Sequence, residues 1–157
     1  MNVTAVESWV ETPLRQFVED ARVVLALLLH PSGQVVAQFG FDRAVDVMSA
    51  CALAAAIHAS AGELGKLLEG RPFRGLHHAG RERQLYLAET RTRRGSYVLL
   101  TVFDEESSLG LVRMYFDELC RRLIAEAPTA PNREEPILEM NFERELNRNL
   151  AALFGRA

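Results

Sequence analysis

Side chains suited to metal binding or nucleophilic catalysis are scarce in this sequence, which holds four histidines and two cysteines. His77 and His78 are adjacent, and because consecutive residues of a strand point to opposite faces of a sheet, their imidazoles do not readily share one metal ion. No cysteine or carboxylate spacing completes a zinc site around them, so we expect no metal or other cofactor. Cys51 falls in an alanine-rich stretch and Cys120 in the last turns of a predicted helix. Neither place is the exposed, electropositive setting of a reactive thiol.

Motifs that hold a nucleotide are also missing. Neither a G-x-x-x-x-G-K-[ST] loop nor a G-x-G-x-x-G turn occurs. Ser107 and Ser108 precede a predicted helix, whose N-terminus is able to bind an anion, but a serine at this place more commonly caps the helix. The chain therefore has no recognisable means of holding a nucleotide itself.

Arginine is concentrated between residues 71 and 94, where seven arginines stand against two glutamates. Such a stretch is suited to steering an acidic partner surface or RNA, or to protecting the edge of a sheet by charge, and edge protection is the commoner use. The sequence pI of about 5.8 argues against a dedicated nucleic-acid binder.

Length and composition are those of one soluble globular domain: 157 residues, 48% hydrophobic, 25% charged, with a net charge of −3. The longest uninterrupted apolar runs, at 23–29 and 51–57, are shorter than the ~20 residues of a membrane span. The first residues show no signal-peptide pattern, and the cysteines show no disulfide framework. We therefore expect a cytoplasmic protein without a membrane span.

The first third of the chain predicts a helix followed by a hairpin. Apolar residues recur at helical spacing over 5–20, and two apolar runs at 23–29 and 34–40 flank a Pro/Ser/Gly turn. The run at 23–29 does not alternate, which is typical of a central strand buried on both faces.

A long helix is predicted over 44–69, with Asp42 as N-cap and Gly70 as its stop. Leu53, Ile57, Leu64 and Leu68 recur at helical spacing and predict the row that faces the core. Alanine, serine and glycine fill the other sides. Small side chains allow a second helix to approach closely, but alanine is also simply the best helix former, and the sequence leaves both interpretations open.

Three further strands are predicted at 73–77, 83–89 and 96–103, and a third helix follows, capped by Ser107 or Ser108. The apolar side of that helix is predicted from five residues: Leu111, Met114, Tyr115, Leu119 and Leu123. The element order α-β-β-α-β-β-β-α predicts an α+β domain with a five-stranded antiparallel sheet.

The proline-rich stretch at 127–136 predicts a linker, so that the domain spans residues 1–126. Residues 137–157 then form a predicted amphipathic helix, the tail, with an apolar side every fourth residue: Leu138, Phe142, Leu146, Leu150 and Phe154. An apolar side must be buried, either on this domain or in the groove of another protein.

Three stretches carry a likeness to a known family: VFDEESSLGLVR at 102–113, GELGKLLEG at 62–70 and HHAGRERQLYL at 77–87. Together with the element order, they resemble the Roadblock (dynein light chain) family, and within it the MglB-like regulators of bacterial gliding. The final RNLAALFGRA is similar to the C-terminal helix of that subfamily. The likeness covers most of the chain, and its first stretch is the most specific.

This resemblance implies a homodimer in which the long second helices pack side by side and the sheets join edge to edge. It further implies that the dimer binds a small Ras-like GTPase of the MglA type on its helical face. There the dimer would promote hydrolysis by repositioning the GTPase's own catalytic residues, without an arginine finger. The C-terminal helix would contact the GTPase elsewhere and favour nucleotide exchange.

On this basis we expect no catalytic residue in the chain, only residues that contact a partner. They are Ala52, Ala56, Ala59, Glu63 and Lys66 on one face of the second helix, and Leu146, Leu150 and Phe154 on the tail. Glu63 departs from the resemblance, because relatives usually keep a small residue there. It predicts either an arginine partner on the GTPase or a paralogue that no longer binds it.

Two rival functions stay open on the sequence. One is a Roadblock paralogue that acts as a scaffold for other Roadblock or polarity proteins without activating a GTPase. The other is a small enzyme that uses His77, His78 or Cys51, which requires one of these in a concave pocket with a perturbed pKa.

Overall fold

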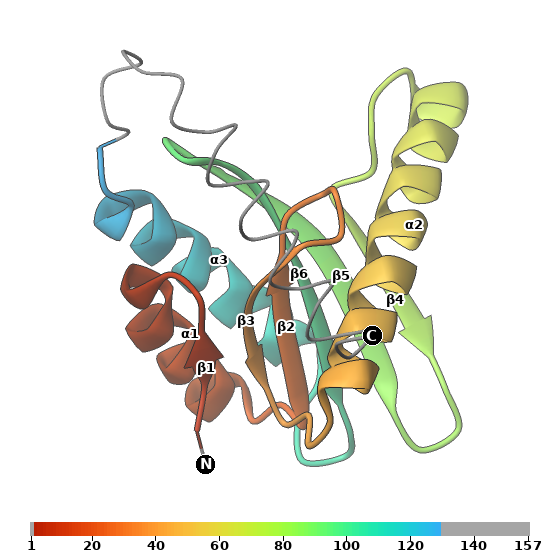
Figure 1. Ribbon diagram of the computed structural model, residues 1–157. Coiled ribbons are helices and arrows are strands. Elements are labelled where there is room, and N and C mark those ends of the chain that lie inside the picture. Colours follow the sequence, from red (N-terminus) through yellow and green to blue (C-terminus); the bar gives the residue numbers. More distant parts are fainter. Residues whose placement is uncertain (1, 130–157) are drawn as a thin grey trace, which may run out of the picture.

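The computed structural model describes residues 2–129, in which one antiparallel sheet lies between two layers of helix (Figure 1). The helices are α1 (Ser8–Ala21), α2 (Ala44–Glu69) and α3 (Leu109–Glu126). The strands are β1 (Thr4–Ala5), β2 (Leu25–Leu29), β3 (Val35–Phe39), β4 (Gly75–Ala79), β5 (Gln84–Thr92) and β6 (Gly95–Phe103). The predicted α+β class and antiparallel sheet are confirmed. Most of the predicted linker and all of the tail lie outside the described residues.

The sheet has six strands in the order β1-β3-β2-β6-β5-β4. Five of them match the predicted strands, and β2 occupies the predicted central place between β3 and β6, with Ala26 to Leu29 buried. The sixth, β1, was not predicted, because a strand of two residues shows no alternation. It pairs with the outer edge of β3 through Thr4 opposite Gln38 and Ala5 opposite Ala37.

Each face of the sheet has its own core. α1 and α3 cover one face, where Leu14, Phe17, Leu99, Phe116 and Leu123 belong to the larger apolar cluster. α2 covers the other face alone, and its Val47, Cys51 and Ala54 join strand residues in a smaller cluster. One helix covers less of a sheet than two do, so the α2 side is the less completely enclosed.

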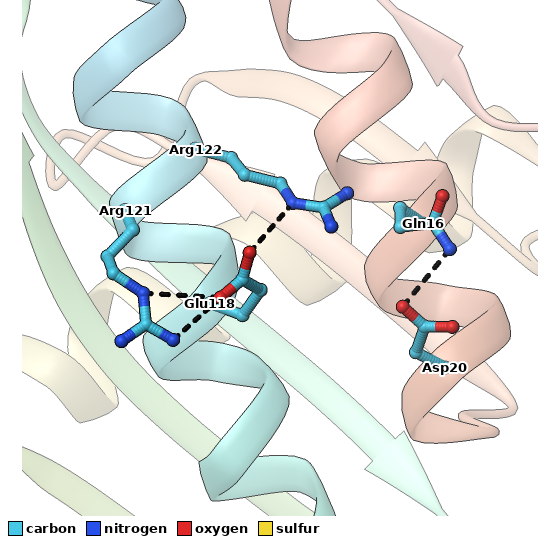
Figure 2. Close-up of polar contacts among 5 residues, drawn as sticks. All are labelled: Gln16, Asp20, Glu118, Arg121 and Arg122. Carbon is cyan, nitrogen blue, oxygen red and sulfur yellow. Dashed lines mark hydrogen bonds and ion pairs between the residues drawn. The ribbon is translucent and has the colours of Figure 1, made fainter.

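On the outer surface of the α1 and α3 layer, polar side chains form hydrogen bonds with other side chains of the same helix (Figure 2). On α3, Glu118 accepts hydrogen bonds from Arg121 at 2.6 Å and Arg122 at 3.1 Å. These two bonds lower the pKa of the Glu118 carboxyl below its ordinary value. On α1, Gln16 donates a hydrogen bond to Asp20 at 3.1 Å. This layer therefore presents hydrated, locally paired groups to the solvent.

The helix ends follow the sequence signals with one exception. Gly70 ends α2 with φ +73°, and Ser108 caps α3 by accepting a hydrogen bond from the Leu111 N–H at 3.2 Å. The predicted N-cap Asp42 is wrong: α2 begins at Ala44 as predicted, and the residue at its N-cap is Arg43, which makes no side-chain cap bond.

The predicted inner row of α2 is wrong at three of its four positions, and only Ile57 packs against the smaller cluster. Leu53, Leu64 and Leu68 are 65%, 49% and 66% exposed, and the buried side of the helix consists instead of Val47, Cys51, Ala54 and Gly65. The physical reason is that the strands beneath supply large side chains, so small residues on α2 let the helix lie close to them. On α3, Met114 is likewise exposed rather than inward.

In the described part of the chain, α2 is the one helix that is long and apolar enough to cross a membrane, judged by length and composition alone. Its 18-residue window has a mean hydropathy of 1.5 and is 17% buried. The apolar runs did not reveal this, because they count uninterrupted residues and not the average over a helix. One such window is weak evidence for a span, and the inner side of α2 belongs to the core of this domain.

Candidate partner-binding surface

The side of α2 that faces away from the sheet is apolar. Six large hydrophobic side chains of this helix are about half exposed or more: Val45, Met48, Leu53, Leu64, Leu67 and Leu68. An apolar surface of this kind commonly marks an interaction site. We refer to it, together with the small residues among them, as the outward face of α2.

The five residues predicted for partner contact lie on this face. Ala52, Ala56, Ala59, Glu63 and Lys66 are all exposed, and their spacing of four, three, four and three residues keeps them on one side of the helix. The three alanines allow a partner backbone to approach closely, and Leu53 and Leu64 flank them with larger apolar surface. The structure thus brings these residues together, and their contact with a partner stays a prediction.

Glu63 carries the charge that departs from the resemblance, and it is paired within the helix. The Lys66 ammonium donates a hydrogen bond to its carboxylate at 2.7 Å, and both side chains are more than half exposed. An exposed pair of this spacing contributes only ~0.3–0.5 kcal/mol to stability. It nevertheless gives the outward face a polar, nearly neutral spot in place of an unpaired charge.

The inner side of α2 is anchored to the sheet by an ion pair. His58 lies 2.9 Å from Glu89 of β5, and both side chains are mostly buried. Burial alone would raise the pKa of Glu89, but hydrogen bonds from Ser96 and Arg91 and the positive charges of His58 and Arg91 lower it overall. This contact lies on the inner side of α2, opposite the exposed alanines.

The two edges of the sheet differ in a way that bears on assembly. β1 covers the edge of β3, and the Val6 N–H continues the pairing by donating to the Val36 carbonyl at 2.8 Å. β4 forms the other edge, is mostly exposed, and lies at the margin of the sheet on the side of α2 (Figure 1). An unpaired strand edge is a template for pairing with another chain. The open β4 edge is therefore a second feature, besides the outward face of α2, that is suited to contact with another chain.

The histidines and cysteines do not assemble into a catalytic site within residues 2–129. His77 shares a hydrogen bond with Gln84 at 2.7 Å on the exposed β4 edge, where His78 is also exposed. Cys51 is 2% exposed, and burial raises the pKa of its thiol. Burial likewise raises the pKa of the Cys120 thiol. No group of three metal-ligating side chains occurs in this part of the chain.

Sequence reasoning missed the large hydrophobic side chains on the outward face, because it assigned Leu53, Leu64 and Leu68 to the core and gave the others no place. The even hydropathy around α2 was the available signal, since a helix with one buried side should show polar residues on the other. The predicted tail residues Leu146, Leu150 and Phe154 lie outside the described residues.

Neither a protein-family model nor a curated protein matches the chain by sequence. Solved structures do match by fold. Myxococcus xanthus MglB aligns with a TM-score of 0.67 and 26% identity over 76% of this chain and 95% of its own. The gliding protein MglB from Thermus thermophilus aligns with a TM-score of 0.65 and 25% identity over 76% of this chain and 88% of its own. A Roadblock/LC7 domain from Streptomyces avermitilis aligns with a TM-score of 0.59 and 18% identity over 69% of this chain and 89% of its own.

The chain has the Roadblock fold and is similar in structure to MglB. The Roadblock fold matches the element order expected from the sequence, with β1 added at one edge. The 95% coverage of the M. xanthus MglB chain means that the likeness extends through the whole domain rather than a single motif. The MglB-like identity also agrees with the stretches at 62–70 and 102–113 on which the resemblance was first based.

Proposed function

We propose that this MglB-like chain is a cytoplasmic homodimer that regulates a small Ras-like GTPase of the MglA type in cell polarity or motility. The observation that carries the proposal is the exposed apolar outward face of α2 in a domain that also has an open strand edge at β4. The likeness to two MglB structures at 25–26% identity supports the Roadblock regulator class.

The dimer forms by contact of α2 with α2 and of β4 with β4 in a second copy. Leu53 and Leu64 of the two α2 helices pack against each other, and pairing of the β4 edges satisfies backbone groups that are open in the single chain. A two-fold arrangement of this kind buries the same surface on both copies. It removes the apolar side chains of α2 from water and leaves the polar α1 and α3 layers outside.

The paired α2 helices then offer a helical face to the GTPase, on which Ala52, Ala56, Ala59, Glu63 and Lys66 make the contact. α2 contains no arginine, which agrees with activation through the GTPase's own catalytic residues. Bound in this way, the dimer stabilises the catalytic arrangement of the GTPase and accelerates hydrolysis. The tail residues Leu146, Leu150 and Phe154 contact a second place on the GTPase and promote exchange.

Single-turnover GTP hydrolysis by the cognate GTPase, with and without saturating dimer, tests this function. We expect acceleration by the unmodified chain. Ala56→Arg should weaken GTPase binding or dimerisation by at least about tenfold, because a long charged side chain holds the partner surface away. Ala125→Arg, at an exposed alanine of α3, is the matched control and should bind normally. Unchanged affinity by calorimetry for Ala56→Arg, together with an intact dimer, would show that another face binds.

A second candidate is a scaffold that binds other Roadblock or polarity proteins without activating hydrolysis. The Glu63 and Lys66 pair in the middle of the outward face favours it, because the resemblance to the Roadblock family implies a small residue at the glutamate position. A GTP hydrolysis rate that does not change at saturating dimer would select the scaffold.

A further inference from the structure

A groove separates α3 from the edge of the sheet and takes no part in the surface described above. It has a volume of about 690 Å³ and is lined by α3, by β5 and by the segment that enters β4. Phe73, Tyr86 and Phe116 supply its apolar wall, and Cys120 lies at its α3 side.

The groove is open because β4 is shorter than β5. Their pairing runs from Ala79 opposite Gln84 to Gly75 opposite Ala88, and β5 continues to Thr92. Along these last residues β5 pairs with β6 on one side only. An occupant therefore finds a free strand edge as well as an apolar wall, which is the combination that bound peptide segments use.

The charges of the groove favour an acidic occupant. Arg74, Arg91 and Arg113 line it, against Glu89 and Asp117. Glu89 is already paired with Arg91 at 3.1 Å and with His58. Arg74 and Arg113 form no ion pair within 4.0 Å to any carboxylate of residues 2–129. Two guanidinium groups thus remain for carboxylates brought by the occupant.

The chain itself supplies a segment of the required chemistry. Residues 134–143 read EEPILEMNFE, with four glutamates, no basic residue and the apolar Ile137, Leu138, Met140 and Phe142. The rest of the tail is different, because its basic residues Arg144, Arg148 and Arg156 all come later. We propose that residues 134–143 occupy the groove between α3 and β5 of their own chain, with their glutamates against Arg74 and Arg113.

The length of the connection permits this docking. α3 ends at Glu126, and the groove reaches back along it from Cys120 to Arg113, about 9–20 Å from the helix end at ~1.5 Å per residue. The eight residues from Glu126 to Glu134 span up to ~26 Å when extended. The acidic segment therefore reaches the groove without strain, and the later part of the tail stays free to contact a partner.

A second groove, of about 330 Å³, lies beside β1, β3 and the start of α2 and is more apolar. Its charged lining residues are Asp42 and Arg43, which balance each other. It gives no preference for four glutamates, so charge complementarity selects the groove at α3.

Cys120 provides a native probe for this docking, because its side chain lines the groove. The other cysteine, Cys51, is buried under α2 and serves as the internal reference. The experiment measures the rate at which each thiol of the full chain reacts with the uncharged reagent 4,4′-dithiodipyridine, with the site of reaction assigned by mass spectrometry. The test variant carries Glu→Gln at residues 134, 135, 139 and 143. Glu→Gln at the exposed residues 19, 105 and 106, none of which lines the groove, is the matched control variant.

We expect Cys120 to react at least about tenfold faster in the four-glutamine variant than in the unmodified chain, and the control variant to leave its rate unchanged. Because the docking is electrostatic in part, ~0.5 M salt should accelerate the reaction in the unmodified chain and not in the variant. Equal rates in the unmodified chain and the variant would overturn the proposal. Protection that disappears on dilution would also overturn it, since the segment would then come from a second copy.

Discussion

Replacement of Leu53 by alanine should weaken self-association far more than it affects folding. Leu53 lies on the outward face of α2 and is 65% exposed in the single chain. Complete burial of a leucine stabilises by ~1.5–3 kcal/mol, so covering the exposed two thirds contributes about 1–2 kcal/mol. In a two-fold dimer both copies lose this contact, for a total of about 2–4 kcal/mol. The dimer dissociation constant should therefore rise by about 30- to 1,000-fold.

Sedimentation velocity over a dilution series measures this change, and thermal unfolding under the same conditions checks that the domain stays folded. Ile124→Ala is the matched control, because Ile124 is 47% exposed on α3, in the layer that the dimer leaves outside. Its dissociation constant should stay within about twofold of the unmodified chain. If Leu53→Ala dissociates no more readily than Ile124→Ala, the outward face of α2 is not the dimer interface.

Two further predictions concern the placement of α2. Gly62→Ala should raise the free energy of unfolding by up to ~1 kcal/mol, because the added Cβ meets no atom within 4 Å and alanine is the better helix former. Gly65→Ala should lower the free energy of unfolding, because the added Cβ would lie 2.5 Å from the Phe73 nitrogen. Urea unfolding compares the two variants, and equal effects would contradict the close approach at Gly65. Glu89→Gln should lower the melting temperature by roughly 3–6 °C at about pH 7, and the deficit should shrink as the pH falls below 4.5. The pKa of Glu89 is lowered on folding, so its stabilisation is present above the ordinary value of 4.5 and is lost as the pH falls through the lowered one; a deficit that persists at low pH would mean that packing, not charge, is responsible.

The sheet was predictable because turn residues and strand patterns agree. The His30 to Gly33 turn closes with the His30 N–H donating to the Gln34 carbonyl at 2.8 Å, and Gly33 adopts a φ of +94° that favours glycine. The run at 23–29 is apolar throughout because β2 lies between two strands and two helical layers. The two-residue β1 was out of reach, since its place depends on the edge of β3 and not on its own sequence.

The orientation of α2 was not predictable from its own sequence. Two rows recur at helical spacing, one of large residues through Leu53 and Leu64 and one of small residues through Cys51 and Ala54. Choosing the large row for the core assumes that the helix must fill the space above the sheet. Here Leu27, Leu87 and Leu100 of the strands fill that space, and the helix approaches with its small row. The choice therefore depends on strands far away in sequence.

The geometry of α2 also allows a second copy and a GTPase to bind the same helix without competing. Leu53 and Leu64 are eleven residues apart, about three turns, and so point in nearly the same direction. Ala59 and Lys66 are seven residues apart, about two turns, and point roughly 140° away from the leucines. If the leucine side meets the second copy, Lys66→Ala should weaken GTPase binding and leave the dimer intact, whereas Leu53→Ala should weaken the dimer first. Calorimetry measures the affinity for the GTPase, and sedimentation measures the stability of the dimer. A Lys66→Ala chain that loses both GTPase binding and dimerisation would show that the two partners share one side of the helix.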